Sequence, residues 1–387
     1  MIQYTNSMDE KKTLNRFAFV DTLRGLAALH VFFYHLALLP NPELAVPYWA
    51  KRIVLSGGTG VTLFFVVSAF TLCYSMRTRN DDSNHVYGFY IRRLFRIVPL
   101  FYVWMVISLI RDGYLYHTQH SLVDMLLSAS FVFNLIPGKE AGIVWASWTL
   151  GVEMLFYLAF PLVFRLITDY RRALAFFLLT IVVAGAFQHL LGYLHLSEEE
   201  LRRYYHFSFL HQLPVFAAGV LTFYFYESFI KDKEVNASWG GAFLALFLFI
   251  YSALLGGRLN IFMDPLYWQA VAYGCFLLGL SIFPWKIIVN KFTVFLGLIS
   301  YSVYLSHTTV ITAFAPLYSN LYSRQMSTDI KFWLSASITL GIVILASYVS
   351  YRLIEEPGMK LGRLLIRKRG RSKQSGDPAV KTETNIA

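Results

Sequence analysis

Charged side chains are scarce in this 387-residue sequence, where Asp, Glu, Lys and Arg make up 15% of the residues. A soluble domain usually carries about a quarter of its residues as these four types. Hydrophobic residues reach 56% and aromatic residues 17%, which excludes a disordered chain and an ordinary water-soluble enzyme. The composition is typical of a polytopic membrane protein, and we expect an all-α integral membrane bundle.

Cysteine is scarce, and several catalytic motifs are absent. The two cysteines, Cys73 and Cys275, both lie in apolar stretches, so the sequence has neither a disulfide framework nor a thiolate metal site. HExxH, GxSxG and a histidine followed five residues later by aspartate are absent. These absences exclude zinc proteases, serine hydrolases and the phosphate-ester acyltransferase motif, and we expect no metal cofactor.

Long apolar runs fill most of the chain. A helix that crosses a bilayer needs roughly 17–25 apolar residues. Ten runs meet this length, at residues 17–39, 53–76, 94–112, 145–168, 173–194, 209–229, 239–256, 266–285, 292–318 and 332–354. An eleventh run, 121–136, is shorter. The prediction is therefore about ten transmembrane helices plus one short re-entrant or interfacial segment.

Lysine and arginine orient these spans. With ten spans, 24 of the 34 basic residues gather on one side of the membrane, which the positive-inside rule assigns to the cytoplasm. We expect a protein of the inner (cell) membrane with a cytoplasmic segment 1–16, a membrane domain 17–365 and a disordered basic cytoplasmic tail 366–387. The net charge of +11 then reflects membrane topology, and we expect no nucleic-acid partner.

The first span contains ionisable residues on one face. Asp21 and Arg24 are three residues apart, so we expect them to pair. His35 follows Arg24 by eleven residues, about three turns or roughly 16 Å, at nearly the same azimuth, whereas His30 lies about 140° away. Ionisable groups within a span are costly and indicate function. The structural alternative is an interfacial ion pair plus a histidine satisfied by a neighbouring helix.

Arginines mark the start of the third span. Arg92, Arg93 and Arg96 precede Pro99 in YIRRLFRIVP. The planar guanidinium suits phosphate, and two arginines three residues apart share a helical face that can clamp a diphosphate. Simple positive-inside anchoring is the alternative reading of the same pattern.

Two more ionisable residues lie within apolar runs. Glu153 is expected in the outer half of the membrane, where a carboxylate needs a partner such as histidine or takes up a proton. His307 lies in the middle of a span, beside serines in GLISYSVYLSH. A neutral hydrogen-bonded acid and a serine-bonded structural histidine are the alternatives for these two residues.

Taken as a set, these segments resemble the type 3 acyltransferase family of multi-spanning membrane proteins. The resemblance covers about 17–365 in the order of the family, and each motif alone is weak. It rests on DTLRGLAALHVFFYH, FFVVSAF, the RxxR element of Arg93 and Arg96, WTLGVEMLFY, GLISYSVYLSH and YRLIEEP. Ala69 departs from the family, which more often has glycine at this position.

The resemblance implies a membrane O-acyltransferase. Members move an acetyl or other short acyl group from an acyl-CoA, acetyl-CoA above all, to a sugar hydroxyl of a surface polysaccharide, a glycolipid or a glycosylated small molecule. The partners expected here are thus acyl-CoA, a carbohydrate acceptor and the lipid bilayer.

On this reading each candidate residue has an expected role. His35 is the general base, and Glu153 fixes its tautomer. Arg93 and Arg96, next to Arg92, bind CoA phosphates. Arg24 stabilises the thioester carbonyl or the pantetheine arm and is oriented by Asp21. His307 is a second acid/base or a structural donor, and a covalent acyl-histidine intermediate stays open.

Two non-enzymatic functions remain as alternatives. A proton-coupled transporter would use the same buried charges, although no inverted repeat is visible. A noncatalytic polysaccharide exporter or flippase is the second. Release of CoA from acyl-CoA by the purified protein distinguishes the enzyme from both.

Overall fold

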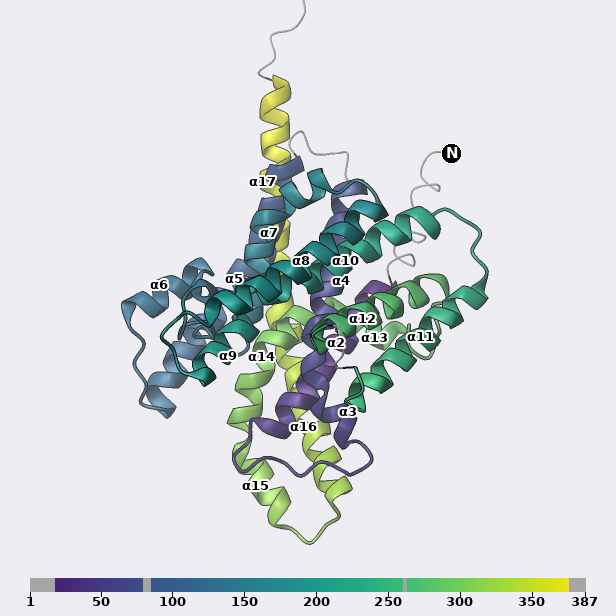
Figure 1. The fold of residues 1–387 in the computed structure, drawn as a ribbon. Helices are drawn as coiled ribbons and strands as arrows, with labels where there is room; N and C mark the ends of the chain where they lie inside the picture. Colours follow the sequence, from purple (N-terminus) through teal and green to yellow (C-terminus); the bar gives the residue numbers. More distant parts are fainter. Residues whose placement is uncertain (1–17, 79–84, 260–262, 376–387) are drawn as a thin grey trace, which may run out of the picture.

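The protein is described from a computed structural model, which covers residues 18–78, 85–259 and 263–375 (Figure 1). Every regular element in these three ranges is helical, as predicted. The longer helices are α2 (Ala18–Leu38), α4 (Gly60–Thr78), α5 (His85–Leu115), α7 (Trp148–Leu166), α8 (Tyr170–Leu191), α10 (Phe209–Phe229), α11 (Ala237–Leu255), α12 (Pro265–Ile282), α14 (Ser300–Ala313), α16 (Thr328–Ser350) and α17 (Glu356–Ser375).

Shorter elements connect them. These are α3 (Lys51–Leu55), η1 (Gly57–Thr59), α6 (Leu122–Ser130), η2 (Phe133–Leu135), α9 (Glu198–Phe207), α13 (Lys291–Leu298), α15 (Ala315–Ser323) and η3 (Tyr351–Glu355). All but three are α-helical: η1 and η2 are 3-10 turns, and η3 is a π-helical turn.

The predicted membrane bundle is confirmed. Within the described ranges, eight helical segments are long and apolar enough to cross a bilayer, or nine if α13 and α14 form one span. These two helices are bent by 75°, so the predicted span 292–318 is broken. The predicted first span forms α2, but its ionisable residues lower its hydropathy and it is not among the eight.

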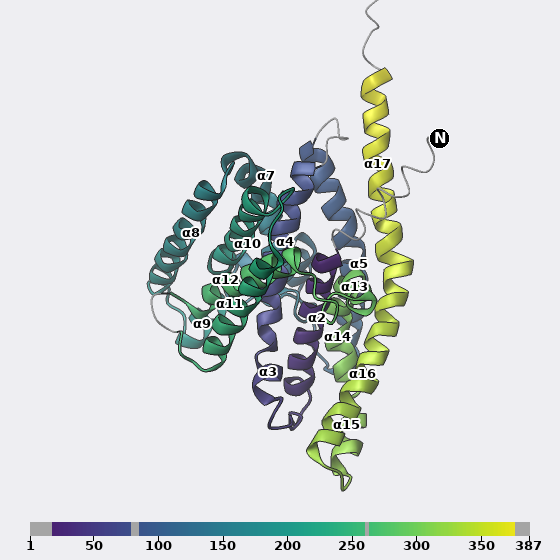
Figure 2. The same cartoon turned by 90° about the vertical axis from the view of Figure 1, so that its right-hand side faces the viewer.

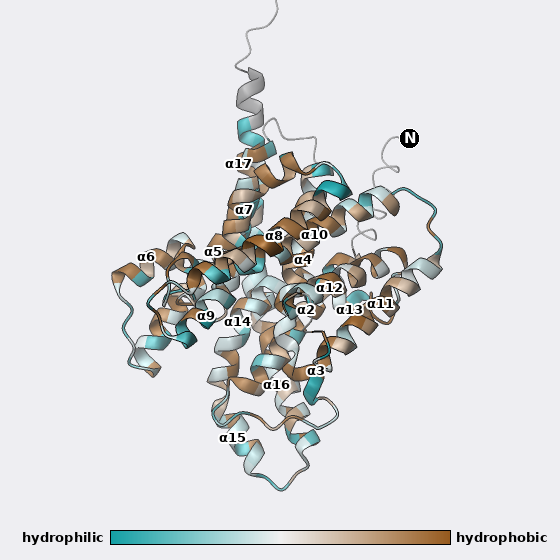
Figure 3. Cartoon of the chain, in the orientation of Figure 1, coloured by the Kyte–Doolittle hydropathy of each residue, from teal (hydrophilic) through white to brown (hydrophobic). Residues whose placement is uncertain are grey.

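Helix α2 lies in the middle of the bundle (Figures 1 and 2). It crosses α13 at close range, because a Cβ atom added to Gly25 would lie 2.6 Å from Thr293 O. Leu23, Phe32 and Leu36 are fully buried. Peripheral helices differ: α8 exposes Leu178, Leu179 and Val182, and its hydropathy is high along its length (Figure 3). The ionisable residues of α2 that were predicted to share a face, Asp21, Arg24 and His35, are partly buried.

The segment 121–136 does not form a spanning helix, in agreement with the prediction. It consists of the nine-residue α6 and the turn η2. Ser121 and Asp124 form a capping box, and Lys139 and Ser121 together lower the pKa of Asp124 to about 2. Leu122, Val123 and Leu126 are exposed, which supports an interfacial position.

Helices α16 and α17 form one long column (Figure 2), interrupted by η3. The column continues to Ser375, so residues 366–375 are helical where the sequence suggested disorder. Leu, Arg and Lys are good helix formers, and the preceding helix provides a nucleus for them. The expected disorder of 376–387 and the expected cytoplasmic segment 1–16 lie outside the described residues.

Candidate active site

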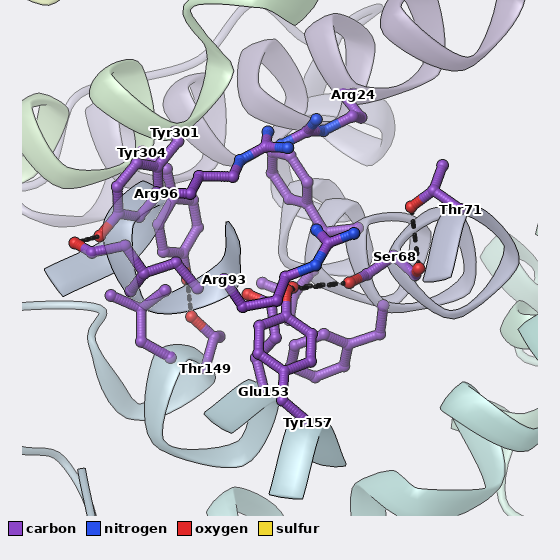
Figure 4. Close-up of a pocket in the computed structure, with 15 residues that line it drawn as sticks. Arg24, Ser68, Thr71, Arg93, Arg96, Thr149, Glu153, Tyr157, Tyr301 and Tyr304 are labelled. Atoms are coloured by element: carbon purple, nitrogen blue, oxygen red, sulfur yellow. Dashed lines mark hydrogen bonds between the residues drawn. The ribbon is translucent and has the colours of Figure 1, made fainter. Parts of the chain in front are cut away.

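A pocket with about 670 Å³ of empty space lies between α2, α4, α5, α7 and α14 (Figure 4). Its polar lining residues are Arg24, Ser68, Thr71, Arg93, Arg96, Thr149, Glu153, Tyr157, Tyr301 and Tyr304. Phe64, Phe65, Ile97 and Leu150 are among the apolar ones. A cavity that combines apolar walls with several convergent polar groups is typical of a ligand site.

Arg24 and Arg96 point toward one another in this pocket (Figure 4). Neither guanidinium group has an ion pair or a hydrogen bond to another residue in the part of the chain that the structure describes. Each arginine lies close enough for its charge to act on the other. Two neighbouring guanidinium groups repel unless an anion lies between them, so this end of the pocket is suited to an anionic ligand.

Arg93 also lines the pocket, one turn before Arg96 on α5. Its guanidinium lies over the rings of Tyr157, at 5.5 Å, and Phe89, at 6.0 Å. The shared face predicted for Arg93 and Arg96 is confirmed, and the arginines point into the protein. Arg92 lies on another side of α5 and does not line the pocket.

Asp21 does not form the predicted ion pair with Arg24. In the described residues, no side-chain nitrogen of Arg24 lies within 4.0 Å of a carboxylate oxygen of Asp21. Arg24 instead extends into the pocket toward Arg96 (Figure 4). Asp21 remains close enough for both Arg24 and Arg96 to act on it through charge. Residues three apart on a helix can meet, but the tertiary pocket offers Arg24 another position.

The π-helical turn η3 brings a second carboxyl group toward the arginines. Glu355 is only 1% exposed, and its Oε2 accepts a hydrogen bond from Ser302 Oγ at 3.0 Å. The nearest positive charges acting on it are Arg96 and then Arg24. The sequence drew attention to YRLIEEP without assigning a role to Glu355. A π-turn, which often occurs at functional sites, has no readable sequence pattern.

Glu153 lies in the pocket but does not contact His35. Its Oε1 accepts hydrogen bonds from Ser68 Oγ, at 2.6 Å, and from the Tyr157 hydroxyl. The predicted pairing of Glu153 with His35 is therefore wrong. Ser68 lies on α4, so its contact with Glu153 depends on how the helices pack. Tyr157 lies on the next turn of the same helix as Glu153.

His35 pairs with His307. His35 Nδ1 and His307 Nε2 are 2.9 Å apart, and the ring centroids are separated by 4.9 Å. His307 is 1% exposed, and its Nδ1 lies 3.2 Å from Val303 O. The sequence placed both histidines in spans but could not show that α2 and α14 bring them together.

The geometry assigns the tautomers of this pair. A backbone carbonyl only accepts, so His307 Nδ1 carries a proton and donates to Val303 O. Neutral His307 Nε2 then accepts from Nδ1–H of His35. The remaining nitrogen of His35, Nε2, keeps its lone pair and is free to act as a base.

His30 lies apart from this pair, as its azimuth predicted. Its Nε2 is 2.9 Å from Ile53 O, and Ser56 Oγ lies 3.4 Å away. These contacts tie the end of α2 to α3 and η1. His30 is therefore a structural histidine.

Tyr304 connects the pocket to the histidine pair. It lines the pocket, and its ring centroid lies 5.7 Å from that of His307. Neither His35 nor His307 lines the pocket itself. The site therefore has two parts, an arginine-rich pocket and a histidine pair, with a tyrosine between them.

Comparison with known proteins gives a family match over most of the chain. A family model described as an acyltransferase domain matches residues 17–352. A protein of Acidianus two-tailed virus, provisionally named an acetyltransferase, is 28% identical over 289 residues, 74% of this chain and 80% of its own length. No solved structure matches.

Two bacterial relatives extend this comparison. A protein of Staphylococcus aureus strain COL, provisionally named an O-acetyltransferase, is 25% identical over 394 residues. The match covers 92% of this chain but 60% of that longer relative. The acyltransferase MdmB of Streptomyces mycarofaciens is 32% identical over 156 residues, 38% of each chain.

Proposed function

This chain belongs to the type 3 acyltransferase family, and from that premise we propose that it transfers a short acyl group from acyl-CoA to a hydroxyl of a carbohydrate. Membership establishes an acyltransferase with a membrane-type helical bundle. The donor, the acceptor and the residue roles below are the proposal.

The arrangement of Arg24 and Arg96 carries the proposal. Two guanidinium groups face one another in a pocket, with Arg93 one turn away. CoA bears a diphosphate and a further phosphate, which match a cluster of guanidinium forks. Each charge-assisted hydrogen bond to phosphate contributes about 1.5–3 kcal/mol, so two or three such contacts supply much of the donor affinity.

The rest of the donor follows the pocket toward the histidines. Phe64, Phe65 and Leu150 provide apolar walls for the pantetheine arm. Arg24 and His35 lie eleven residues apart on α2, a rise of about 16 Å. The donor therefore binds with its phosphates at the arginines and its thioester near Tyr304 and the histidine pair. The distribution of Lys and Arg supports a cytoplasmic position for the arginine end and for both termini.

The transfer step uses the lone pair on His35 Nε2. This nitrogen removes the proton from the acceptor hydroxyl while the hydroxyl oxygen forms a bond to the thioester carbonyl carbon. The tetrahedral intermediate collapses as the C–S bond breaks. The sulfur leaves as a thiolate and takes the proton back from His35, so the products are an O-acyl ester and CoA.

His307 is a positioning residue in this mechanism. It accepts from His35 Nδ1–H and so holds the proton away from Nε2. The imidazolium that forms on His35 can still donate through Nδ1 to His307. Glu153, bound to Ser68 and Tyr157, instead shapes the pocket around Arg93.

Purified protein in detergent tests the proposal. We expect it to bind CoA and to release CoA from acetyl-CoA, faster when a carbohydrate acceptor is present. Loss of O-acetyl groups from surface glycans of deletion cells, detected by mass spectrometry, then identifies the acceptor. A protein that binds no CoA and releases none would refute the proposal and favour an exporter or a transporter.

A further inference from the structure

Two hydrogen bonds hold the Tyr304 hydroxyl in place. Thr149 Oγ1 donates to the Tyr304 hydroxyl at 2.9 Å, and that hydroxyl donates to Ala146 O at 3.1 Å. Thr149 Oγ1 also lies 3.1 Å from Ala146 O. The network joins α14 to the start of α7 and to the segment that precedes it, so the ring position is strongly determined.

Ala146, whose carbonyl oxygen accepts from the Tyr304 hydroxyl, has an unusual backbone conformation. Its φ is +66°, a left-handed conformation that a residue with a Cβ seldom adopts. Such a residue persists only where surrounding contacts hold it, and these residues cluster at functional sites. Here the Tyr304 hydroxyl, which donates to the carbonyl oxygen of Ala146, is such a contact.

The Tyr304 ring lies next to both parts of the site. Tyr304 is 6% exposed and lines the pocket together with Phe64, whose ring centroid is 5.6 Å away. The centroid of the His307 ring lies 5.7 Å from that of Tyr304. An acyl group that enters from the arginine end therefore meets Tyr304 where it comes nearest to the histidine pair.

We propose that Tyr304, clamped by Ala146 and Thr149, is the residue that limits the length of the acyl group. The inference rests on the proposed function and deepens it, because it names the residue that restricts the donor to short acyl chains. A short chain fits between the pocket and the ring with its carbonyl beside the histidines. Each added methylene has to displace an aromatic ring whose hydroxyl is held by two hydrogen bonds.

Replacement of the ring tests this assignment. The ratio of kcat/KM for butyryl-CoA to that for acetyl-CoA is measured by CoA release from the full-length protein in detergent. One methylene in an apolar pocket changes specificity by about 10–200-fold. We expect Tyr304→Ala to raise the ratio at least about tenfold, Tyr304→Leu to raise it less, and Tyr304→Phe, which keeps the ring but loses the hydroxyl that clamps it, to raise it least of the three.

Tyr301→Ala is the matched control. Tyr301 lines the same pocket one turn earlier on α14, but its hydroxyl donates to Ile97 O on α5. Its loss is expected to change activity without shifting the chain-length ratio.

The outcomes distinguish the proposed role of Tyr304 from the proposed acyl transfer. An active Tyr304→Ala or Tyr304→Leu enzyme with the wild-type ratio would overturn the inference alone, as would an equal shift in Tyr301→Ala. If the wild-type protein released no CoA from either thioester, the proposed function would fail and this inference with it.

Discussion

The pairing of His35 with His307 gives a prediction that separates a positioning residue from a second acid or base. Replacing His307 with leucine removes the acceptor that faces His35 Nδ1–H. The Nδ1 proton then keeps at most its contact with the Val31 backbone. Loss of the hydrogen bond to His307 costs about 1–3 kcal/mol. The ring can avoid this cost by moving the proton to Nε2, but that tautomer has no lone pair toward the acceptor.

The expected loss of activity in His307→Leu follows from this free-energy cost. A difference of 1.36 kcal/mol corresponds to a factor of ten in rate, so we expect His307→Leu to lower kcat by about 5–160-fold. The arginine end of the pocket is unchanged, and the KM for acetyl-CoA should stay close to that of the wild type. Initial rates of CoA release, measured at varied acetyl-CoA concentration with saturating acceptor, give both constants.

His307→Gln is the informative companion. The glutamine amide oxygen can accept from His35 Nδ1–H, but the amide cannot take up or release a proton at neutral pH. We therefore expect glutamine to restore much of the activity that leucine loses. If glutamine proved as inactive as leucine at equal expression, His307 would transfer protons itself. Wild-type rates in both variants would refute a catalytic role for the pair.

Further predictions concern the base, the donor site and the topology. His35→Ala should lose about 10²–10⁴ in rate while CoA affinity is retained, whereas His30→Ala should keep near-normal rates; an active His35→Ala enzyme would contradict the mechanism. Arg24→Ala and Arg96→Ala should each weaken CoA binding by about 1.5–3 kcal/mol in calorimetry, and wild-type affinity in both would show that neither contacts phosphate. A Pro137→Cys variant should react with a membrane-impermeant maleimide from outside the cell; labelling only from the cytoplasm would invert the topology.

Local spacing predicted some of this site well. The three-residue interval of Arg93 and Arg96 fixes a shared helical face, and both arginines lie in the pocket. The azimuth argument separated His30 from His35, and their partners differ accordingly. These inferences succeed because helix geometry alone determines which residues of one helix lie together.

Contacts between helices were not predictable in the same way. The choice of His307 over Glu153 as the partner of His35 depends on how α14 packs against α2, with a 75° bend before α14 that no sequence pattern marks. The burial of Glu355 depends on a π-turn within a continuous helical column. Both features arise from tertiary packing, where side chains compete for partners that lie far apart in the sequence.

The π-turn also has a consequence for the evolution of this column. A π-helical turn has hydrogen bonds from i to i+5, so it contains more residues than an α-helical turn. Deleting one residue within Tyr351–Glu355 would restore a regular helix and rotate every side chain that follows by about 100°. The contacts of α17 with α5, including the close approach of Gly358 to Phe95 O, would be lost together. The length of these five residues is thus constrained more tightly than the identity of most of them.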